Sequence, residues 1–194
     1  MTTRIAIIRH GTTAWNKAGR LQGHSDIPLD EEGREQARKL GQRMTEGPWD
    51  LVYSSHLQRA KETASIMAAA ITHPHTLMED ARLREAGGGL IEGTTEAERI
   101  AQWGSDWKLM DLGVEATTEV IARGVSFLDD LLAEHAGKNI LIVSHGGFIR
   151  KLISHLVPEA PHQVMLKNTA VTELLHADNS WSCQLYNSVT HLEE

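Results

Sequence analysis

The stretch Arg4-Ile5-Ala6-Ile7-Ile8-Arg9-His10-Gly11 contains the pattern that decides the fold. An apolar run over residues 5–8 gives way at once to a guanidinium, an imidazole and a glycine. Short continuous apolar runs are typical of strands buried on both faces of a parallel sheet. The same arrangement returns in Asn139–Ser144, which leads into His145-Gly146-Gly147. The two segments predict central strands of one sheet, each ending in a histidine and a glycine.

Helical segments separate the strands. Residues 50–54 predict a further buried strand, and helices are predicted from the N-cap Asp30 to the Gly47-Pro48 stop, from about 58 to 71, from Thr118 to Glu134 and after His145. The residues expected to face the core are Ala37, Leu40, Gly41 and Met44, then Ala60, Ala64, Met67, Ala68 and Ile71, then Ile121, Val125, Leu128 and Leu132. This alternation predicts an α/β fold, a three-layer sandwich whose mostly parallel central sheet is flanked by helices.

The remaining segments are less regular. Residues 84–95, with three consecutive glycines, predict a loop, and the C-terminal part predicts strands at 164–166, 171–175 and 183–186. The chain contains no repeat, low-complexity stretch or clear linker. We therefore expect residues 1–194 to form a single domain, with a small lobe around residues 85–118.

Composition narrows the class of protein. The chain has 194 residues, a formal net charge of −7 and a hydrophobic share of 41%, which suits a globular domain with a sizeable core. The acidic balance argues against a nucleic-acid partner, and no apolar run is long enough for a membrane span. The single cysteine, Cys183, reads as a small strand residue and cannot form an internal disulfide, so we expect a cytoplasmic protein. The oligomeric state stays open, a homodimer included.

Polar side chains gather where the predicted strands end. Residues 9–11 follow the first strand, residues 55–59 the second and residues 145–147 the late central strand. In sheets of this type, ligands bind beyond the carboxyl ends of the strands. Arginine binds phosphate through two parallel hydrogen bonds, glycine lets the backbone approach a ligand, and a neutral imidazole is a good nucleophile. These residue types together predict a site for a small phosphorylated substrate.

Several motifs have simpler interpretations. His73-Pro74-His75 has a spacing that suits a metal, but no nearby ligand set supports it, and a solvated loop explains it as well. The glycines at 87–89 lack the spacing and the preceding strand of a dinucleotide-binding loop. Trp103 and Trp107 suit either a core or a substrate pocket. A buried structural histidine is the alternative to a catalytic His10, although two His-Gly steps after apolar strands are hard to explain by packing.

The run Arg9-His10-Gly11-Thr12-Thr13-Ala14-Trp15-Asn16 resembles the signature of the histidine phosphatase superfamily, the phosphoglycerate-mutase-like proteins. The resemblance continues in the same order through residues 21–29, 53–64, 83–85, 91–93 and 143–147. It implies a phosphoglycerate-mutase-like fold and a histidine acid-type phosphatase, a phosphomonoester hydrolase that works through a phosphohistidine intermediate. It implies no metal and no other cofactor.

Carried over residue by residue, the resemblance implies a role for each site position. His10 is the nucleophile, and Arg9 and Arg59 clamp the phosphoryl oxygens. His145 completes the pocket as a donor to a phosphoryl oxygen and a partner of His10. Glu85 is the general acid and later the base. Only the Leu-Arg-Glu match selects it, since the local sequence leaves four other carboxylates open, namely Glu79, Asp80, Glu92 and Glu96. The substrate-binding positions are Asn16, which can also orient the imidazole, Gln22, Gly23 and Gly146.

One segment departs from the family pattern. Relatives usually carry an aromatic residue where this chain has Ile91, and the stretch from there to Thr118 is short. That region shapes the substrate pocket in the family, so sugar phosphates, phosphoserine, α-ribazole phosphate and phosphorylated glycolytic acids all stay open. A phosphoglycerate mutase is the alternative function, but mutases tend to carry a longer insertion and a C-terminal tail. A non-catalytic phosphate-ligand binder is disfavoured because every expected residue is present.

Overall fold

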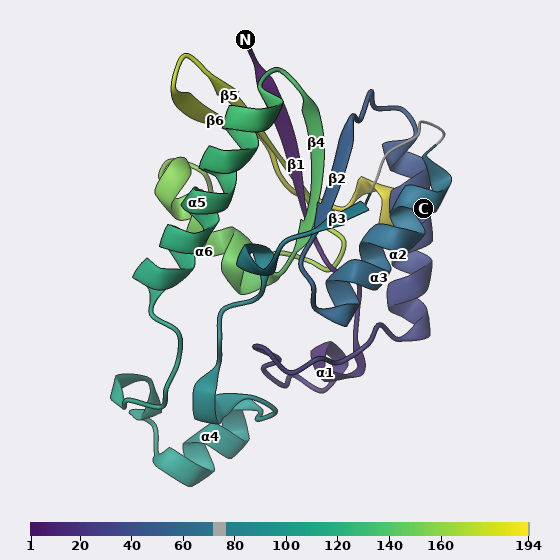
Figure 1. The fold of residues 1–194 in the computed structure, drawn as a ribbon. Helices are drawn as coiled ribbons and strands as arrows, with labels where there is room; N and C mark the ends of the chain where they lie inside the picture. Colours follow the sequence, from purple (N-terminus) through teal and green to yellow (C-terminus); the bar gives the residue numbers. More distant parts are fainter. Residues whose placement is uncertain (72–76, 194) are drawn as a thin grey trace.

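The central element is a mixed β-sheet, seen in a computed structural model that describes residues 1–71 and 77–193 (Figure 1). Within the described residues the sheet has six strands in the order β3-β2-β4-β1-β5-β6. The strands are β1 Thr3–Arg9, β2 Leu51–Ser54, β3 Leu77–Glu79, β4 Asn139–Ser144, β5 Val171–Ala177 and β6 Ser180–Ser188. The first four strands are mutually parallel, whereas β5 and β6 form an antiparallel hairpin at one edge. The predicted α/β fold with a mostly parallel sheet is confirmed.

The register of the parallel strands brings their polar ends together. Arg9 of β1 pairs with Ser144 of β4, and Ser54 of β2 pairs with Val143. The residues that follow, His10, Ser55 and His145, therefore leave the same edge of the sheet. This edge is the carboxyl end of the strands, where α/β sheets bind ligands.

Two helices cover each face of the sheet (Figure 1). One face carries α2 Glu31–Met44 and α3 Gln58–Ala70, and the other carries α5 Thr117–His135 and α6 Gly146–Leu156. Asp30 caps α2 as predicted, because its Oδ1 accepts a 2.8 Å hydrogen bond from the Gly33 N–H. The faces predicted for α2 and α3 are confirmed, except that Ala68 is only half-buried.

The predicted core face of α5 is wrong for two of its four residues, Ile121 and Leu132, whereas Leu128 is buried and Val125 packs against the core. Ile121, Val125 and Leu132 are only half-buried, and the buried residues of the helix are Val120, Gly124, Phe127, Leu128 and Leu131. The reason is Gly124, where a Cβ would lie 2.9 Å from Leu152 Cδ1 of α6. The two helices approach at a glycine, and a pattern of apolar side chains cannot register such a contact.

Other boundaries also differ from the predictions. Residues 164–166 form no strand, since Val164 and Met165 are exposed and only Leu166 is buried. The short elements β3, α1 Ala14–Lys17 and α4 Glu96–Trp103 were not predicted. His73-Pro74-His75 lies outside the described residues. No helix in the described part of the chain combines the length and apolarity that a bilayer crossing requires.

The segment between β3 and α5 folds against itself beyond the carboxyl ends of the strands (Figure 1). We call residues 89–114, which include α4, the lobe. Its buried residues Ile91, Trp107 and Leu112 form a small cluster separate from the two main cores, with Leu21 and Trp103 against it. Trp107 is thus a core residue of the lobe, and the half-buried Trp103 packs against this core. Ile91, at the position that departs from the family pattern, belongs to the same cluster.

Candidate active site

His10 is held at the end of β1 by its own backbone and by the next carbonyl. Its N–H donates to the Ser144 carbonyl at 2.9 Å, and its Nδ1 lies 2.7 Å from the Gly11 carbonyl oxygen. A carbonyl can only accept, so Nδ1 carries the proton. The side chain is 2% exposed. Its ring centroid lies 5.2 Å from that of His145.

The surroundings of His10 keep its imidazole neutral. Burial lowers its pKa well below 6.5, and the charges of Arg59 and Arg9 lower it further. The hydrogen bond to Gly11 opposes this shift with a smaller effect. With the proton on Nδ1, the lone pair stays on Nε2. A neutral imidazole with a free Nε2 lone pair is the form that attacks an electrophile.

His145 follows β4 and is fully buried beside His10. Its Nε2 lies 2.8 Å from Ser55 Oγ, which also accepts a 3.2 Å bond from the Leu57 N–H. Burial, followed by the charge of Arg59, lowers the pKa of His145 well below 6.5. We assign the Ser55 hydroxyl as the donor to Nε2, which leaves the ring proton on Nδ1. That Nδ1 is buried and has no hydrogen-bond partner in the described structure.

Two buried arginines reach the same place. Arg59, in the first turn of α3, is 0% exposed, and its two terminal nitrogens donate to the Ser25 and Gly23 carbonyls at 2.8 Å each. Arg9 donates through Nη1 to the Leu166 carbonyl. A Cβ at Gly146 would lie 3.3 Å from Arg9 Nε, so the glycine makes room for the guanidinium. Arg59 is therefore a buried residue and not a surface residue of its helix.

Neither Arg9 nor Arg59 forms a salt bridge in the described structure, although the nearby charge of Glu85 acts on both guanidinium groups. Burial lowers the pKa of Arg59 to about 10 and also lowers that of Arg9, and both stay protonated at neutral pH. Among the described residues, the Nε atoms of both arginines and Nδ1 of His145 are buried without a hydrogen-bond partner. Buried donors of this kind need acceptors. An anion with several oxygens supplies them.

The carboxylate of Glu85 lies at the N-terminus of α6. Oε1 accepts hydrogen bonds from the N–H groups of Ala86 at 2.8 Å and Phe148 at 2.7 Å. Oε2 accepts from the Gly147 N–H at 3.0 Å. Helix N-termini favour negative charge. A Cβ at Gly147 would lie 2.7 Å from Oε1, so a glycine is needed for this approach.

The loop that binds Arg59 is shaped by a different carboxylate. Glu92 accepts from the His24 N–H at 2.8 Å, the Ser25 N–H at 3.0 Å and the Gly88 N–H at 2.9 Å. Gly23 has a φ of +50°, and a Cβ there would lie 2.0 Å from Glu92 Oε1. Burial opposes ionisation of Glu92, but these hydrogen bonds outweigh it and lower its pKa. Glu92 therefore anchors this loop to the lobe.

Asn16 and Gln22 bind their neighbours and not the imidazole. Gln22 Oε1 accepts from the Thr13 hydroxyl at 2.9 Å. Asn16 Oδ1 accepts from the Thr13 N–H at 3.1 Å and from Asn168 Nδ2 at 3.3 Å. The expected orientation of the His10 ring by Asn16 is thus supplied by the Gly11 carbonyl.

Several supporting residues were not foreseen. Asn168 Nδ2 donates to the His10 carbonyl at 2.9 Å, and Thr63 Oγ1 accepts from the Gly11 N–H at 3.0 Å. Ser55 lies between β2 and α3, in the polar segment 55–59 that the sequence places at a strand end. Asn168 precedes β5, and nothing in its local sequence connects it with His10, which is 158 positions away.

The other carboxylates near Glu85 in the sequence have structural partners. Glu79 pairs with Lys61 at 2.6 Å, Asp80 with Arg82 at 2.7 Å and Glu96 with Arg99 at 3.0 Å. Glu85 is the one of the five whose carboxylate lies against Gly147, next to the His145-Gly146 step. Among residues 1–71 and 77–193, no three His, Cys, Asp or Glu side chains are grouped closely enough to hold a metal ion.

The chain matches a known protein family over most of its length. Residues 5–189 match the profile of the histidine phosphatase superfamily (branch 1). Phosphoglycerate mutase-like protein 4 of Arabidopsis thaliana is 35% identical over 201 residues, covering 98% of this chain and 87% of that protein. The metal-independent phosphoserine phosphatase of Arabidopsis thaliana is 30% identical over 200 residues, covering 98% of this chain and 83% of that protein.

A solved structure extends the likeness to the fold. The mycobacterial glucosyl-3-phosphoglycerate phosphatase, in its complex with VO3, has a TM-score of 0.85 and 27% sequence identity. The match covers 95% of this chain and 99% of that chain. The sheet, the helices and the phosphoglycerate-mutase-like architecture are therefore shared over nearly the whole length of both proteins.

Proposed function

The chain belongs to the histidine phosphatase superfamily, and on that premise we propose that it is a phosphomonoester hydrolase whose nucleophile is Nε2 of His10. One observation carries the proposal. A buried, neutral imidazole lies beside His145 and within the influence of two arginine charges that form no salt bridge in the described structure. Nucleophile and oxyanion donors in one buried place are the requirements of phosphoryl transfer.

In the first step, His10 Nε2 attacks phosphorus and the bond from phosphorus to the ester oxygen breaks. Protonated Glu85 gives its proton to the departing oxygen, so the product leaves as an alcohol. Arg9, Arg59 and His145 Nδ1–H bind the three remaining phosphoryl oxygens as their charge grows. The products of the step are phospho-His10, a free alcohol and the Glu85 carboxylate.

In the second step, a water molecule takes the place of the alcohol. The Glu85 carboxylate accepts a proton from this water while its oxygen attacks phosphorus. The bond from phosphorus to Nε2 breaks, which releases inorganic phosphate and restores neutral His10. Glu85 is protonated again, so the cycle closes with His10 and Glu85 in their starting forms.

The substrate that we propose is a small phosphorylated metabolite, of the kind in which a three-carbon acid carries the phosphate on its hydroxyl. The names of a phosphoserine phosphatase and a glucosyl-3-phosphoglycerate phosphatase among the similar proteins support this class. The acid-type character is part of the same proposal, because His10 stays neutral below pH 6.5. The single cysteine of the chain is consistent with a cytoplasmic location.

A phosphoglycerate mutase is the second candidate, favoured by the name of the mutase-like relative from Arabidopsis thaliana. A mutase returns the phosphoryl group to another hydroxyl and must protect phospho-His10 from water. It should therefore hold a long-lived phosphoenzyme and need a bisphosphate primer. A phosphatase should release phosphate without one.

The decisive experiment is a panel of phosphomonoesters combined with rapid acid or base quenching of the enzyme. We expect steady phosphate release without a primer, and a transient phosphoenzyme that is labile in acid and stable in base. His10→Ala should lose both. Phosphate release that survives His10→Ala would contradict the mechanism, and the absence of release from every ester would support a non-catalytic binder.

A further inference from the structure

The general acid in the proposed mechanism is held by an ion pair that lies outside the phosphoryl site. The pair consists of Glu115, just before α5, and Arg123, within α5. Arg123 Nε donates to Glu115 Oε1 at 2.8 Å and Arg123 Nη2 donates to Oε2 at 3.1 Å. The side chains are only 9% and 12% exposed. A buried two-point contact of this kind has a defined geometry.

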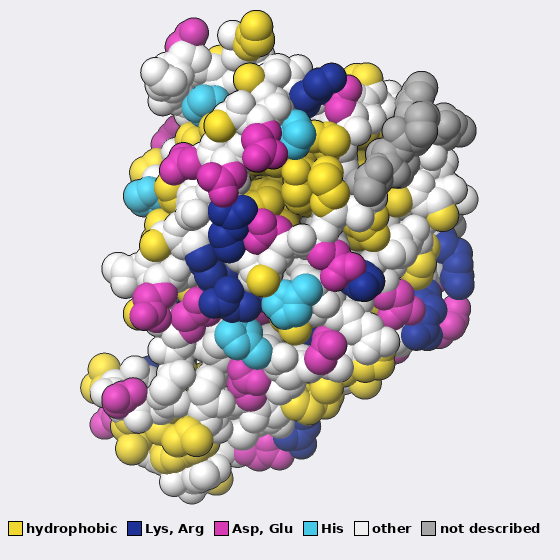
Figure 2. Space-filling view, viewed as in Figure 1, with side chains coloured by type: hydrophobic (Ala, Val, Ile, Leu, Met, Phe, Trp, Pro, Cys, Tyr) yellow, Lys and Arg dark blue, Asp and Glu magenta, His cyan; other side chains and the backbone are white. Residues whose placement is uncertain are grey.

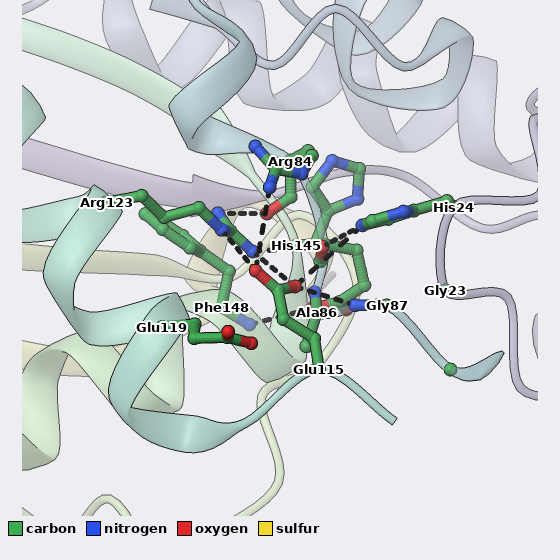
Figure 3. Close-up of polar contacts among 12 residues, drawn as sticks. Gly23, His24, Arg84, Ala86, Gly87, Glu115, Glu119, Arg123, His145 and Phe148 are labelled. Carbon is green, nitrogen blue, oxygen red and sulfur yellow. Dashed lines mark hydrogen bonds and ion pairs between the residues drawn. The ribbon is translucent and has the colours of Figure 1, made fainter. Parts of the chain in front are cut away.

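Arg123 uses its other hydrogen bonds on the backbone that carries Glu85. Nη1 donates to the carbonyl of Arg84 at 2.8 Å and also to that of Arg82, and Nη2 donates to the Glu85 carbonyl at 3.0 Å. One guanidinium therefore binds three carbonyls within four consecutive residues. Figure 3 shows Arg123 and Glu115 against this backbone, and Arg84 Nη2 and His24 Nε2 also lie near the Glu115 carboxylate, at 3.6 Å and 3.9 Å.

The same guanidinium also contacts the partner of the Glu85 carboxylate. The centre of the Arg123 guanidinium lies 4.9 Å from the centroid of the Phe148 ring. The N–H of Phe148 donates to Glu85 Oε1 at 2.7 Å. Arg123 thus contacts both the backbone of Glu85 and Phe148, whose N–H donates to the Glu85 carboxylate.

Glu115 connects this arrangement to the lobe. Its Oε2 accepts from the Gly87 N–H at 2.8 Å, and its own N–H donates to the Gly87 carbonyl at 2.9 Å. These bonds join the two chain segments at which the lobe leaves the main body. Burial opposes ionisation of Glu115, but hydrogen bonds from Arg123 and Gly87 outweigh it and lower its pKa. His24 adds a further contact, because its Nε2 donates to the Glu85 carbonyl at 2.9 Å.

We propose that Glu115 and Arg123 form a positioning pair that holds the Glu85 carboxyl group where it can protonate the leaving oxygen. The inference rests on the proposed function of Glu85. The pair touches no reacting atom and acts only through Glu85. An ion pair that merely joined the lobe to α5 would change stability and would scale activity toward all substrates alike.

The dependence of rate on the leaving group separates these two roles. A poor leaving group needs its proton in the transition state, whereas a good one departs without it. The measurement is kcat/KM, which reports formation of phospho-His10, for 4-substituted phenyl phosphates that differ in phenol pKa and little in size. Arg123→Lys keeps the charge but cannot reach three carbonyls and a carboxylate at once. Glu115→Gln keeps the shape and removes the charge.

For both variants we expect kcat/KM to fall roughly tenfold or more with the poorest leaving group and less than about threefold with 4-nitrophenyl phosphate. Glu85→Gln should show the same steepened dependence. Adding Arg123→Lys to Glu85→Gln should cause little further loss, because the pair acts through Glu85. Asp130→Asn is the matched control. Asp130 lies in α5, like Arg123, and the substitution removes the charge from its 2.6 Å ion pair with Arg82. It should leave the whole series unchanged.

An equal loss across the series, or no loss, in the folded variants would overturn the positioning role. The amide signals of Gly147 and Phe148 in NMR spectra give a readout without turnover, because both N–H groups bond to Glu85. They should shift in Arg123→Lys and in Glu115→Gln, and stay in place in Asp130→Asn. Unmoved signals would also refute the inference. An inactive wild-type chain would instead count against the proposed function, and the amide signals would still test the pair.

Discussion

At the scale of single residues, burial sets the chemistry of the site. His10 would be an ordinary exposed base in an unfolded chain, but folding places it at 2% exposure beside Arg9 and Arg59. Its charged form loses its hydration and meets two positive charges, so the neutral form is favoured. The Gly11 carbonyl then decides which nitrogen keeps the proton. These surroundings keep His10 in the neutral form that its proposed role as nucleophile requires.

The ionisation of His10 can be tested directly. A pKa well below 6.5 means that the imidazole stays neutral as the pH falls through 6.5, so the nucleophile persists into mildly acidic solution. We expect the ¹⁵N chemical shifts of His10 to show the Nδ1–H tautomer at neutral pH and at pH 6.5. This direct measurement is needed because phosphate esters themselves titrate near pH 6, which affects a rate profile. Protonation of His10 at or above pH 6.5 would contradict the structure.

At the scale of elements, the N-terminus of α6 matters most for the reaction. His145 is its N-cap, Gly146 leaves room for Arg9, and the N–H groups of Gly147 and Phe148 bind Glu85. One helix start therefore brings together the proposed phosphoryl-group donor, His145, and the backbone N–H groups that bind the proposed general acid, Glu85. This explains why two glycines open a helix in which they are otherwise unfavourable.

Gly147→Ala tests this arrangement. The new Cβ would lie 2.7 Å from Glu85 Oε1 and must displace the carboxyl group. A misplacement of about 1 Å can lower a rate on the order of a hundredfold, so we expect a large loss of kcat/KM for alkyl phosphates. Thermal unfolding should change little or rise slightly, because alanine favours a helix by about 1 kcal/mol over glycine.

Ser154→Ala, farther along α6, is the control for this substitution. In the part of the chain that the structure describes, its hydroxyl donates to the Lys151 carbonyl, one turn away. Both activity and unfolding should therefore resemble those of the wild type. Full activity of Gly147→Ala toward alkyl phosphates would show that Glu85 does not need its hydrogen bonds to the N-terminus of α6.

At the scale of the whole molecule, the chain consists of a central sheet with its helices and a smaller lobe. The residues proposed to bind the phosphoryl group leave the sheet near β1 and β4, which are buried on both faces. The lobe has its own small cluster and exposes large apolar side chains, among them Leu90, Leu109 and Met110. Figure 2 shows Lys or Arg and His side chains gathered where the lobe meets the main body. We therefore expect the lobe to influence which ester binds and the sheet to determine the chemistry.

Trp107→Ala tests the independence of the lobe. Trp107 is 8% exposed, packs with Ile91 and Leu112, and donates from Nε1 to Glu96 at 3.2 Å. Truncating a buried tryptophan costs about 3–5 kcal/mol where the site cannot collapse. We expect faster amide hydrogen exchange in the lobe, unchanged exchange in β1 and β4, and a rise in KM larger than the fall in kcat. Equal loss of protection in the central strands would show that the lobe and the sheet unfold together.

The sequence by itself determined the strand and helix alternation, the family and the residues at the strand ends. These features depend on short-range patterns: an apolar run that becomes a buried strand, a cap such as Asp30, and histidines placed directly after strands. His10, Arg59 and His145 could be named because the carboxyl ends of parallel strands must meet at one edge of the sheet. Where a contact depended on a missing side chain, as at Gly124 on α5, the pattern placed two residues, Ile121 and Leu132, on the core face wrongly.

Only the tertiary structure decided how these residues are supported. Glu85 and Gly147 are 62 positions apart, and Arg123 reaches the Glu85 carbonyl from 38 positions away. Local sequence cannot encode such contacts, because the partner is selected by how helices and lobe pack against the sheet. Tertiary packing determines the tautomer of His10, the hydrogen bonds of Glu85 to α6 and the Glu115–Arg123 pair. The family resemblance selects Glu85 as the proposed general acid, and the packing of α6 determines where its carboxylate lies.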